Sequence, residues 1–191
     1  MQTLTDDFKK QFGITEVIKS FTDSGQKVVY IVKDVSGKML AMKAFRNCTN
    51  RDIQEIEILN RFKTLPGISK VVRVEDYQGS PLVFEENIDG PDLHDIQASY
   101  AGNADKVARL IKDTCNILKP IWNERIVHRD LKPKNIKVLA NGSPVVMDFG
   151  IARDLSIASI TQPGQRQPMT WDYASPEQYA GDKGAISYRT D

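Results

Sequence analysis

Five runs of β-branched, aromatic and other apolar residues lie in the first ninety positions, and such runs are typical of strands. They cover residues 14–21, 26–35, 38–45, 71–77 and 81–86. Ser36 and Gly37 separate the second run from the third and predict a hairpin turn. A helix is predicted over residues 49–62, because Thr49 and Asp52 are spaced as in a capping box and apolar residues follow at helical spacing. These apolar residues are Ile53, Ile56, Leu59 and Phe62.

The pattern changes after Asn87. Residues 88–92 are rich in turn formers, and over residues 104–122 the apolar positions have the period of a long amphipathic helix. They are Val107, Leu110, Ile111, Thr114, Leu118 and Ile121. An antiparallel sheet followed by a mainly helical part predicts an α+β fold. We place the boundary between residues 1–86 and residues 87–191.

Composition excludes several classes of protein. The 191 residues carry 26 Lys and Arg against 25 Asp and Glu, a formal net charge of +1, with 40% hydrophobic and 27% charged residues. This balance argues against a disordered tail and against binding to nucleic acid. No apolar run approaches the roughly 18 residues of a membrane span, and the polar first residues do not form a signal peptide. Cys48 and Cys115 form no metal-ligand pattern, so we expect reduced thiols, a cytoplasmic location and no membrane partner.

Four short motifs occur in an informative order. Residues 128–135 read HRDLKPKN and match the protein-kinase catalytic loop H-R-D-L-x-x-x-N at every fixed position. Residues 148–150 read DFG, thirteen positions after Asn135. Upstream, residues 41–43 read AMK at the end of a predicted strand, as in the V-A-I-K motif. Downstream, residues 175–177 read SPE and are similar to A-P-E, with serine in place of alanine.

With these motifs the chain resembles the eukaryotic-like serine/threonine protein kinase family, with features of its bacterial members, from about Ile14 to Asp191. The resemblance implies a two-lobed kinase fold. Residues 1–86 would form an N-lobe with a five-stranded antiparallel sheet and the helix called αC. Residues 87–191 would form a mainly helical C-lobe that is truncated at the start of the helix called αF.

The chemistry of phosphoryl transfer explains the residue types, because transfer demands positioning and charge neutralisation rather than covalent catalysis. The resemblance assigns Asp130 as the base that accepts the proton of the substrate hydroxyl. Lys132 would place a positive charge on the γ-phosphate, and its position is typical of the serine/threonine class. Asn135 and Asp148 offer the hard oxygen ligands that suit Mg²⁺. We therefore expect ATP and Mg²⁺, or Mn²⁺ in its place, and a protein substrate.

Lys43 is expected to bind the α- and β-phosphates, held in place by a glutamate of the predicted helix. Glu55 and Glu57 are the candidates, and at about 3.6 residues per turn they lie roughly 200° apart, so both cannot face the site. The family pattern, in which hydrophobic residues follow the glutamate, favours Glu55. Only twelve residues separate Lys43 from Glu55, which implies a shortened αC helix.

The alignment of residues 81–86 with the family implies an adenine site. This run resembles the strand that leads into the hinge between the lobes, and Phe84 takes the gatekeeper position. The implied adenine contacts are the backbone carbonyl of Glu85, the backbone N–H of Asn87 and the side chains of Val29 and Ala41. Asp92 is left as a candidate ribose partner.

Two positions depart from the family. Its glycine-rich phosphate loop falls on residues 22–29, where none of the three glycine positions holds glycine. Gly25, between the second and third positions, is therefore the remaining candidate for a close approach of the backbone to phosphate. Lys137 stands where the family has an apolar floor beneath adenine. We expect its methylene groups to pack there and its ammonium group to reach solvent.

The activation segment of the family follows the DFG motif. There an arginine at the position of Arg129 often binds a phosphate, for which the candidates are Ser156, Ser159, Thr161 and Thr170. Thr170 also stands where the family has a threonine that contacts Asp130 and Lys132, and this structural role is the one we expect. His128 is expected to be a packed structural residue rather than a base, and Phe149 and Leu59 to belong to the core.

The last residues approach helix αF. Asp191 matches the first aspartate of that helix, which in the family holds the backbone of the catalytic loop. The helices that follow it in the family are not in this sequence, and Glu177 therefore lacks its family partner. We expect a partner protein or a further C-terminal segment to cover the end of the C-lobe.

These observations favour an ATP-dependent serine/threonine protein kinase. The alternative is a nucleotide-binding, pseudokinase-like regulatory or scaffold module, or an inactive kinase fragment. The loop without glycines and the absent helices favour the alternative. The complete set of catalytic side chains opposes it.

Overall fold

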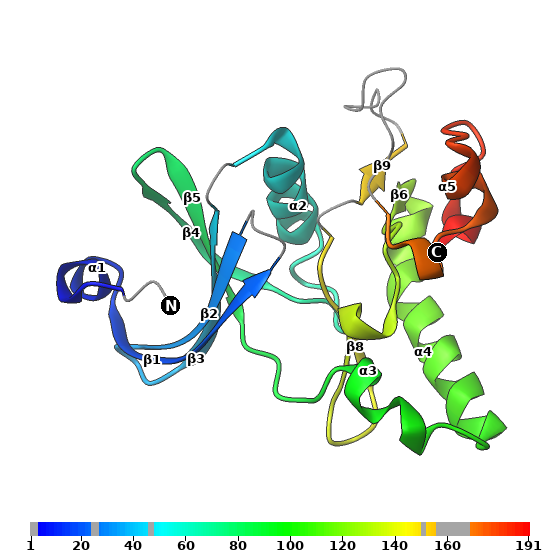
Figure 1. The fold of residues 1–191 in the computed structure, drawn as a ribbon, viewed down its shortest axis with the longest axis horizontal. Helices are drawn as coiled ribbons and strands as arrows, with labels where there is room; N and C mark the ends of the chain where they lie inside the picture. Colours follow the sequence, from blue (N-terminus) through cyan, green and yellow to red (C-terminus); the bar gives the residue numbers. More distant parts are fainter. Residues whose placement is uncertain (1–3, 24–26, 46–47, 150–151, 156–168) are drawn as a thin grey trace. The chain divides into compact units, whose positions relative to one another are not determined.

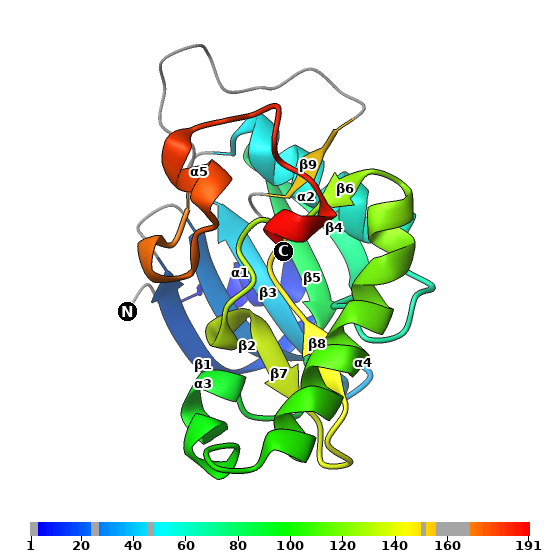
Figure 2. The ribbon, with the colours of Figure 1, turned by 90° about the vertical axis from the view of Figure 1, so that its right-hand side faces the viewer.

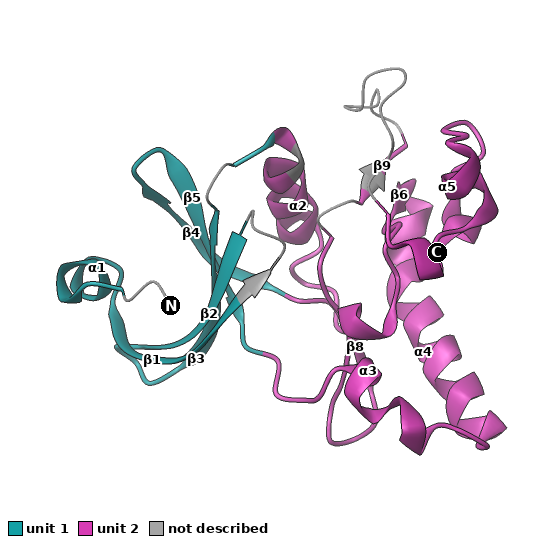
Figure 3. Cartoon of the chain, viewed as in Figure 1, with its two compact units in different colours: residues 1–49, 70–87 teal, residues 50–69, 88–191 magenta. Residues whose placement is uncertain are grey.

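The computed structural model describes residues 4–23, 27–45, 48–149, 152–155 and 169–191. The chain forms two compact units, with residues 1–49 and 70–87 in unit 1 and residues 50–69 and 88–191 in unit 2 (Figure 3). The expected boundary after residue 86 lies within one residue of the third crossing between the units, after residue 87. The two divisions differ over residues 50–69, and the assignment of lobes stays a prediction.

Unit 1 is built on a five-stranded antiparallel sheet in the order β1-β2-β3-β5-β4 (Figure 1). Its strands are β1 Ile14–Asp23, β2 Lys27–Asp34, β3 Met39–Phe45, β4 Val71–Tyr77 and β5 Ser80–Glu86. The five predicted strands are confirmed, each with its ends within two residues. The turn at Ser36 and Gly37 is confirmed too, and the Ser36 N–H and hydroxyl both donate to Asp34 Oδ1, at 2.8 and 2.6 Å.

The two faces of this sheet carry different side chains. Residues directly opposite on neighbouring antiparallel strands share a face. One face carries the opposed residues Tyr30, Met42 and Phe84, all buried in the apolar core of unit 1. The other face carries Lys43 with its neighbours in register, which are Val29 and Val83 directly opposite, and Ile31, Ala41 and Glu85 one step away. Lys43 and Phe84 therefore lie on opposite faces.

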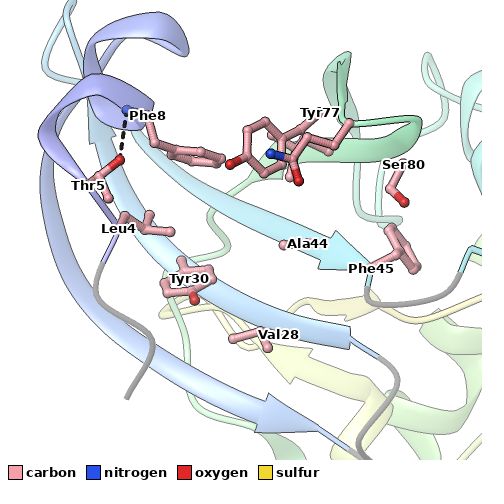
Figure 4. A pocket seen from close by; sticks show the side chains of 11 residues that line it. Leu4, Thr5, Phe8, Val28, Tyr30, Ala44, Phe45, Tyr77 and Ser80 are labelled. Carbon is pink, nitrogen blue, oxygen red and sulfur yellow. Dashed lines mark hydrogen bonds between the residues drawn. The ribbon is translucent and has the colours of Figure 1, made fainter.

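A short helix that the hydrophobic pattern did not predict packs on the core face. Helix α1 (Asp6–Gln11) begins at Thr5, whose side chain accepts a hydrogen bond from the Phe8 N–H at 3.2 Å. Phe8 and Phe12 pack edge-on against Tyr77, and their ring centroids lie 4.9 and 5.9 Å, respectively, from that of Tyr77. A cavity of about 480 Å³ lies between α1 and the strands (Figure 4). A capping threonine followed by two aspartates was the missed signal.

Unit 2 is organised around helix α4 (Ala104–Asn123), beside which the hairpin of β7 and β8 lies (Figure 2). Its other elements are α2 Asn50–Arg61, α3 Leu93–Ile96, η1 Gln97–Ser99, β6 Ile126–Val127, η2 Pro133–Asn135, β7 Ile136–Val138, β8 Pro144–Val146, β9 Arg153–Asp154, η3 Trp171–Tyr173, α5 Pro176–Ala180 and η4 Tyr188–Thr190. The predicted long helix is confirmed. Its buried face is shorter than expected, because Thr114, Leu118 and Ile121 are buried whereas Val107 and Ile111 are 37% and 57% exposed.

Helix α2 confirms the other predicted helix, but the side chains that it buries differ from those expected. Its buried side chains include Glu55 and Leu59, and Phe62 just beyond its end is buried too, while Ile53 is 47% exposed. The face is rotated because a carboxylate, rather than an isoleucine, takes one of the inward positions. At its end, Arg61 pairs with Glu124 and, at 3.6 Å, with Asp154, which ties α2 to the residues after α4 and to β9.

The segment after α2 joins the β7–β8 hairpin. The Ser69 N–H donates to the Val146 carbonyl at 3.1 Å, and the Val146 N–H donates to the Gly67 carbonyl at 2.8 Å. Gly67 has a φ of +81°, and a Cβ atom there would collide with Ile117. Glycine is therefore required at this turn on two grounds.

Further expectations from the sequence concern the cysteines and two core residues. Both cysteines are free thiols, as expected. Leu59 and Phe149 are each 1% exposed, which confirms them as core residues. In the part of the chain that the structure describes, no helix combines the length and apolarity needed to cross a membrane.

Candidate active site

The predicted catalytic residues of the loop after β6 come together in unit 2. Thr170 Oγ1 donates to Asp130 Oδ1 at 2.6 Å, and Lys132 Nζ donates to Asp130 Oδ2 at 2.7 Å. Lys132 Nζ also donates to Thr170 Oγ1 at 2.7 Å. The contacts expected of Thr170 are confirmed. They hold the Asp130 carboxylate by both oxygens, and the group is only partly buried, so it can still meet a substrate.

Asn135 is also part of the hydrogen-bond network on Asp130. Its side-chain amide donates to the backbone carbonyl of Asp130 at 2.9 Å and to Asp130 Oδ2 at 3.0 Å. Asn135 is 6% exposed. Because the amide nitrogen is committed to Asp130, the amide oxygen is directed away from it, and this is the atom that could bind a cation.

Asp191 holds the backbone at the start of the catalytic loop. Its Oδ2 accepts from the His128 N–H at 2.8 Å and from Trp122 Nε1 at 2.9 Å, and its Oδ1 accepts from the Arg129 N–H at 2.6 Å. This confirms the role expected of Asp191. The contact also explains how Arg129 keeps its left-handed conformation, with a φ of +70°, which costs energy in any residue other than glycine.

His128 links the catalytic loop to the DFG motif. It is fully buried, its Nε2 lies 2.9 Å from the Met147 carbonyl oxygen, and its ring centroid is 4.6 Å from that of Phe149. The Met147 N–H donates to the Asn135 carbonyl at 2.8 Å. These contacts confirm His128 as a structural residue. Asp148, which follows Met147 and begins the DFG motif, has a φ of +59°. Like Arg129, it is therefore a strained residue at a motif.

The donor set fits a small hard cation. The oxygens of Asn135 and Asp148 are the type of ligand that Mg²⁺ takes, and Mg²⁺ usually completes its octahedron with waters and substrate phosphates. No cluster of three or more His, Cys, Asp or Glu side chains that could hold a metal occurs among the described residues. The protein would therefore supply one or two ligands, and a nucleotide would supply others. Asn135 and Asp148 as ligands stay a prediction.

Unit 1 brings together Val29, Ala41 and Lys43, on the face of the sheet opposite the apolar core. The side chain next to Lys43 is Glu85, whose Oε1 lies 2.5 Å from Lys43 Nζ. The expectation that Phe84 is the gatekeeper was wrong. Phe84 is fully buried on the other face, where Arg73 packs over its ring at 4.0 Å.

The backbone of Glu85 lies within the sheet, with Ala41 of β3 on one side and Val71 of β4 on the other. Asn87 follows the last residue of β5 and is half-buried. In unit 2, Glu55 is 2% exposed while Glu57 is exposed, in line with the choice of Glu55 as the inward glutamate. The adenine contacts and the pairing of Lys43 with Glu55 stay predictions.

Lys137 differs from the expectation. Its Nζ donates to the Gly90 carbonyl at 3.0 Å and pairs with Asp92 Oδ1 at 3.0 Å, and its side chain is 26% exposed. The ammonium group thus binds the segment before α3 instead of reaching solvent. Asp92, the candidate ribose partner, is engaged by this lysine.

Several predicted residues lie outside the described residues. They are Gly25 and the phosphate candidates Ser156, Ser159 and Thr161.

Gln178 is a supporting residue that the motif analysis missed. It is 2% exposed, and its Nε2 donates to the Arg129 carbonyl at 2.9 Å while its Oε1 accepts from the Ser175 N–H at 3.1 Å. It therefore joins the SPE motif to the catalytic loop. The glutamine next to the motif glutamate was a visible signal, but a residue type alone could not reveal a contact across 49 positions.

Glu177, expected to lack its family partner, has another one. The Thr190 hydroxyl donates to Glu177 Oε1 at 2.5 Å and holds the pKa of that carboxyl below its ordinary value of 4.5.

We predict that NMR titration gives Glu177 a pKa below 4.5 and that Thr190→Val raises it. A lowered pKa stabilises the folded state at pH values above the ordinary pKa, and this contribution disappears as the pH falls through the folded-state pKa. An unchanged titration curve in Thr190→Val would contradict the assigned cause. Thr5→Val, which removes the hydroxyl that caps α1, is the control and should leave the Glu177 pKa unchanged.

Comparisons with known proteins agree with this geometry. The family model described as "Protein kinase domain" matches residues 24–191. The probable serine/threonine-protein kinase PknB of Lactococcus lactis is 28% identical over 179 residues, which cover 89% of this chain and 28% of that protein. PknB of Mycobacterium leprae is 32% identical over 171 residues, covering 83% and 26%. AfsK of Streptomyces griseus is 27% identical over 202 residues, covering 100% and 24%. The chain spans about a quarter of the length of these relatives.

Proposed function

Because the chain belongs to the protein kinase domain family, we propose that it transfers the γ-phosphoryl group of Mg-ATP to a serine or threonine hydroxyl of a protein. The observation that carries the proposal is the network on Asp130. Thr170 and Lys132 hold its two carboxylate oxygens at 2.6 and 2.7 Å, which orients the carboxylate to accept the proton of a hydroxyl nucleophile. The names of the relatives as serine/threonine-protein kinases support the class of acceptor.

The roles of the other residues follow from their charges. Lys132 Nζ lies beside the base, where a cation can neutralise charge on the transferred group. Bound Mg²⁺ would supply charge neutralisation at the phosphates, with Asn135 and Asp148 as its protein ligands. Lys43 would bind the phosphates from unit 1. The work of the protein is thus orientation and charge placement.

The adenine contacts need a shift of register. Since Glu85 rather than Phe84 lies beside Lys43, Glu85 takes the gatekeeper position. The backbone contacts then move on by one residue, from Glu85 and Asn87 to the carbonyl of Glu86 and the N–H of Ile88. Val29 and Ala41 keep their expected role of covering the ring.

Metal dependence tests the reaction. We expect the 191-residue chain, incubated with γ-labelled ATP and Mg²⁺, to label a generic protein substrate or itself on serine or threonine. EDTA should abolish the labelling, and Mg²⁺ or Mn²⁺ in excess should restore it, because the carboxylate and amide oxygens bind such ions. Transfer at the same rate in EDTA would contradict the assigned ligands.

The second candidate is a nucleotide-binding module without turnover, which the phosphate loop without family glycines favours. Calorimetry and the labelling assay together separate it from the kinase. A module would bind ATP in the calorimeter but would transfer no phosphate in the labelling assay.

The expected covering partner stays a proposal. An apolar groove of about 500 Å³ in unit 2 is where such a partner or segment would fit. It is lined by residues of α4, of the catalytic loop and of the last turn, among them Ile111, Leu118 and Tyr188.

A further inference from the structure

Strand β5 carries a buried carboxylate, that of Glu85, to which the proposed function gives no role. The side chain of Glu85 is 1% exposed. Charged side chains are this deeply buried almost only when a partner compensates them. Lys43 supplies the opposite charge, with its Nζ 2.5 Å from Glu85 Oε1 and its side chain 10% exposed. Unit 1 thus contains a buried ion pair.

The strand register makes this pair a property of the sheet. Ala41 lies opposite Glu85, and Lys43 lies opposite Val83. Lys43 and Glu85 are therefore diagonal neighbours on adjacent strands and on one face, a separation that long side chains bridge. Strands β3 and β5 are in turn flanked by β2 and β4. The pair needs no element outside this one sheet.

Other ion pairs of the same sheet differ in kind. Lys38 and Glu86 approach to 3.5 Å with side chains 50% and 38% exposed. Arg73 and Glu75 also approach to 3.5 Å, with side chains 33% and 40% exposed. Exposed pairs contribute little to stability, whereas the loss of one partner of a buried pair leaves an uncompensated charge. Glu85 is thus the glutamate of the sheet whose charge is coupled to a functional lysine.

We propose that Glu85 is a positioning residue for Lys43. Its carboxylate holds the ammonium group at the face that carries Val29 and Ala41, where the lysine is ordered before a ligand arrives. The identity of that ligand, the phosphates of a nucleotide, rests on the proposed function. The sheet itself then performs a task that the family scheme gives to a helix glutamate.

The pairing can be observed without any activity. In ¹⁵N-labelled chain free of nucleotide, the Lys43 ammonium group should give a slowly exchanging ¹H–¹⁵N NMR cross-peak, because it is buried and held in an ion pair. Glu85→Gln should abolish the cross-peak, and the matched control Glu75→Gln should leave it unchanged. The absence of the cross-peak from the wild type, or its persistence in Glu85→Gln, overturns the proposal.

Stability gives a second measurement that tolerates poorly folding variants. Lys43→Met and Glu85→Met should each lower the melting temperature by several degrees, and the double variant should recover most of the loss, since an apolar pair of similar volume can replace a buried ion pair. A double variant that folds where the single variants do not supports the coupling. Additive losses overturn it, and if no variant folds, the wild-type cross-peak decides.

Ligand binding tests the positioning role. By calorimetry, Glu85→Gln should weaken ATP binding about tenfold, because the neutral amide no longer holds the ammonium group by its charge, and leave adenosine binding unchanged. An equal loss for both ligands indicates a structural role only and overturns the proposal, as does unchanged ATP affinity. A chain with these effects and no phosphoryl transfer contradicts the proposed function alone. A wild type that binds neither ligand also contradicts that function, and the cross-peak then tests the pairing by itself.

Discussion

Asp130→Asn is expected to lower the rate of phosphoryl transfer by roughly 10²- to 10⁴-fold, the usual contribution of a positioned general base. The amide is nearly isosteric: its oxygen can still accept from Lys132, and its NH2 group can donate to the Thr170 hydroxyl, so the loop should keep its shape. What is lost is the negative charge that accepts a proton. The measurement is kcat with saturating Mg-ATP, together with the affinity for ATP, which should change little.

Asp105→Asn is the matched control, because Asp105 is an exposed carboxylate in the first turn of α4. It should retain the wild-type rate. An Asp130→Asn variant that transfers phosphate at an unchanged rate would falsify the assignment of the base. The melting temperature of the variant shows whether a loss of rate comes from unfolding.

Asp191→Ala is expected to lower the free energy of unfolding by about 3 kcal/mol and to abolish most of the transfer activity. Its carboxylate accepts three hydrogen bonds, two of them from the backbone of the catalytic loop and one from Trp122. A hydrogen bond to a charged group contributes about 1.5–3 kcal/mol, and a buried donor left without its acceptor costs a similar amount. The strained φ of Arg129 loses its restraint at the same time.

Urea denaturation and kcat measure the two effects of Asp191→Ala. Asp182→Ala is the matched control, since Asp182 Oδ1 also accepts from two backbone N–H groups, of Gly184 and Ala185, but in an exposed turn after α5 rather than in the catalytic loop. Asp182→Ala should lower the free energy of unfolding by less than Asp191→Ala does and should leave kcat unchanged. Equal losses in the two variants would show that Asp191 only caps a turn.

The catalytic loop was predictable because its chemistry demands particular residue types at a fixed spacing over eight positions. Local contacts then follow from the motif, as with Asn135 and Asp130, which are five residues apart. The resemblance also carried the longer contacts of Thr170 and Asp191 with the loop, since in each case the matching residue stands at a motif position.

The faces of elements were predicted less well. Helical spacing placed Ile53 and Ile111 on buried faces, yet both are exposed, because periodicity gives the direction of a stripe without saying which part of it another element covers. Helix α1 escaped the analysis since one turn and a half shows no period. The partners of Lys137 were missed because a lysine can either reach solvent or bind a nearby carbonyl, and residue type does not distinguish these outcomes.

By itself the sequence determined the family, the five strands of the sheet and the two long helices, and it predicts the residues that carry the chemistry, because these depend on local pattern and motif spacing. Tertiary structure decided which residue of β5 lies beside Lys43. A shift of one residue along a strand moves a side chain to the other face, so Phe84 belongs to the core and Glu85 to the lysine. Only the pairing of β3 with β5 settles that register, and no local pattern encodes it.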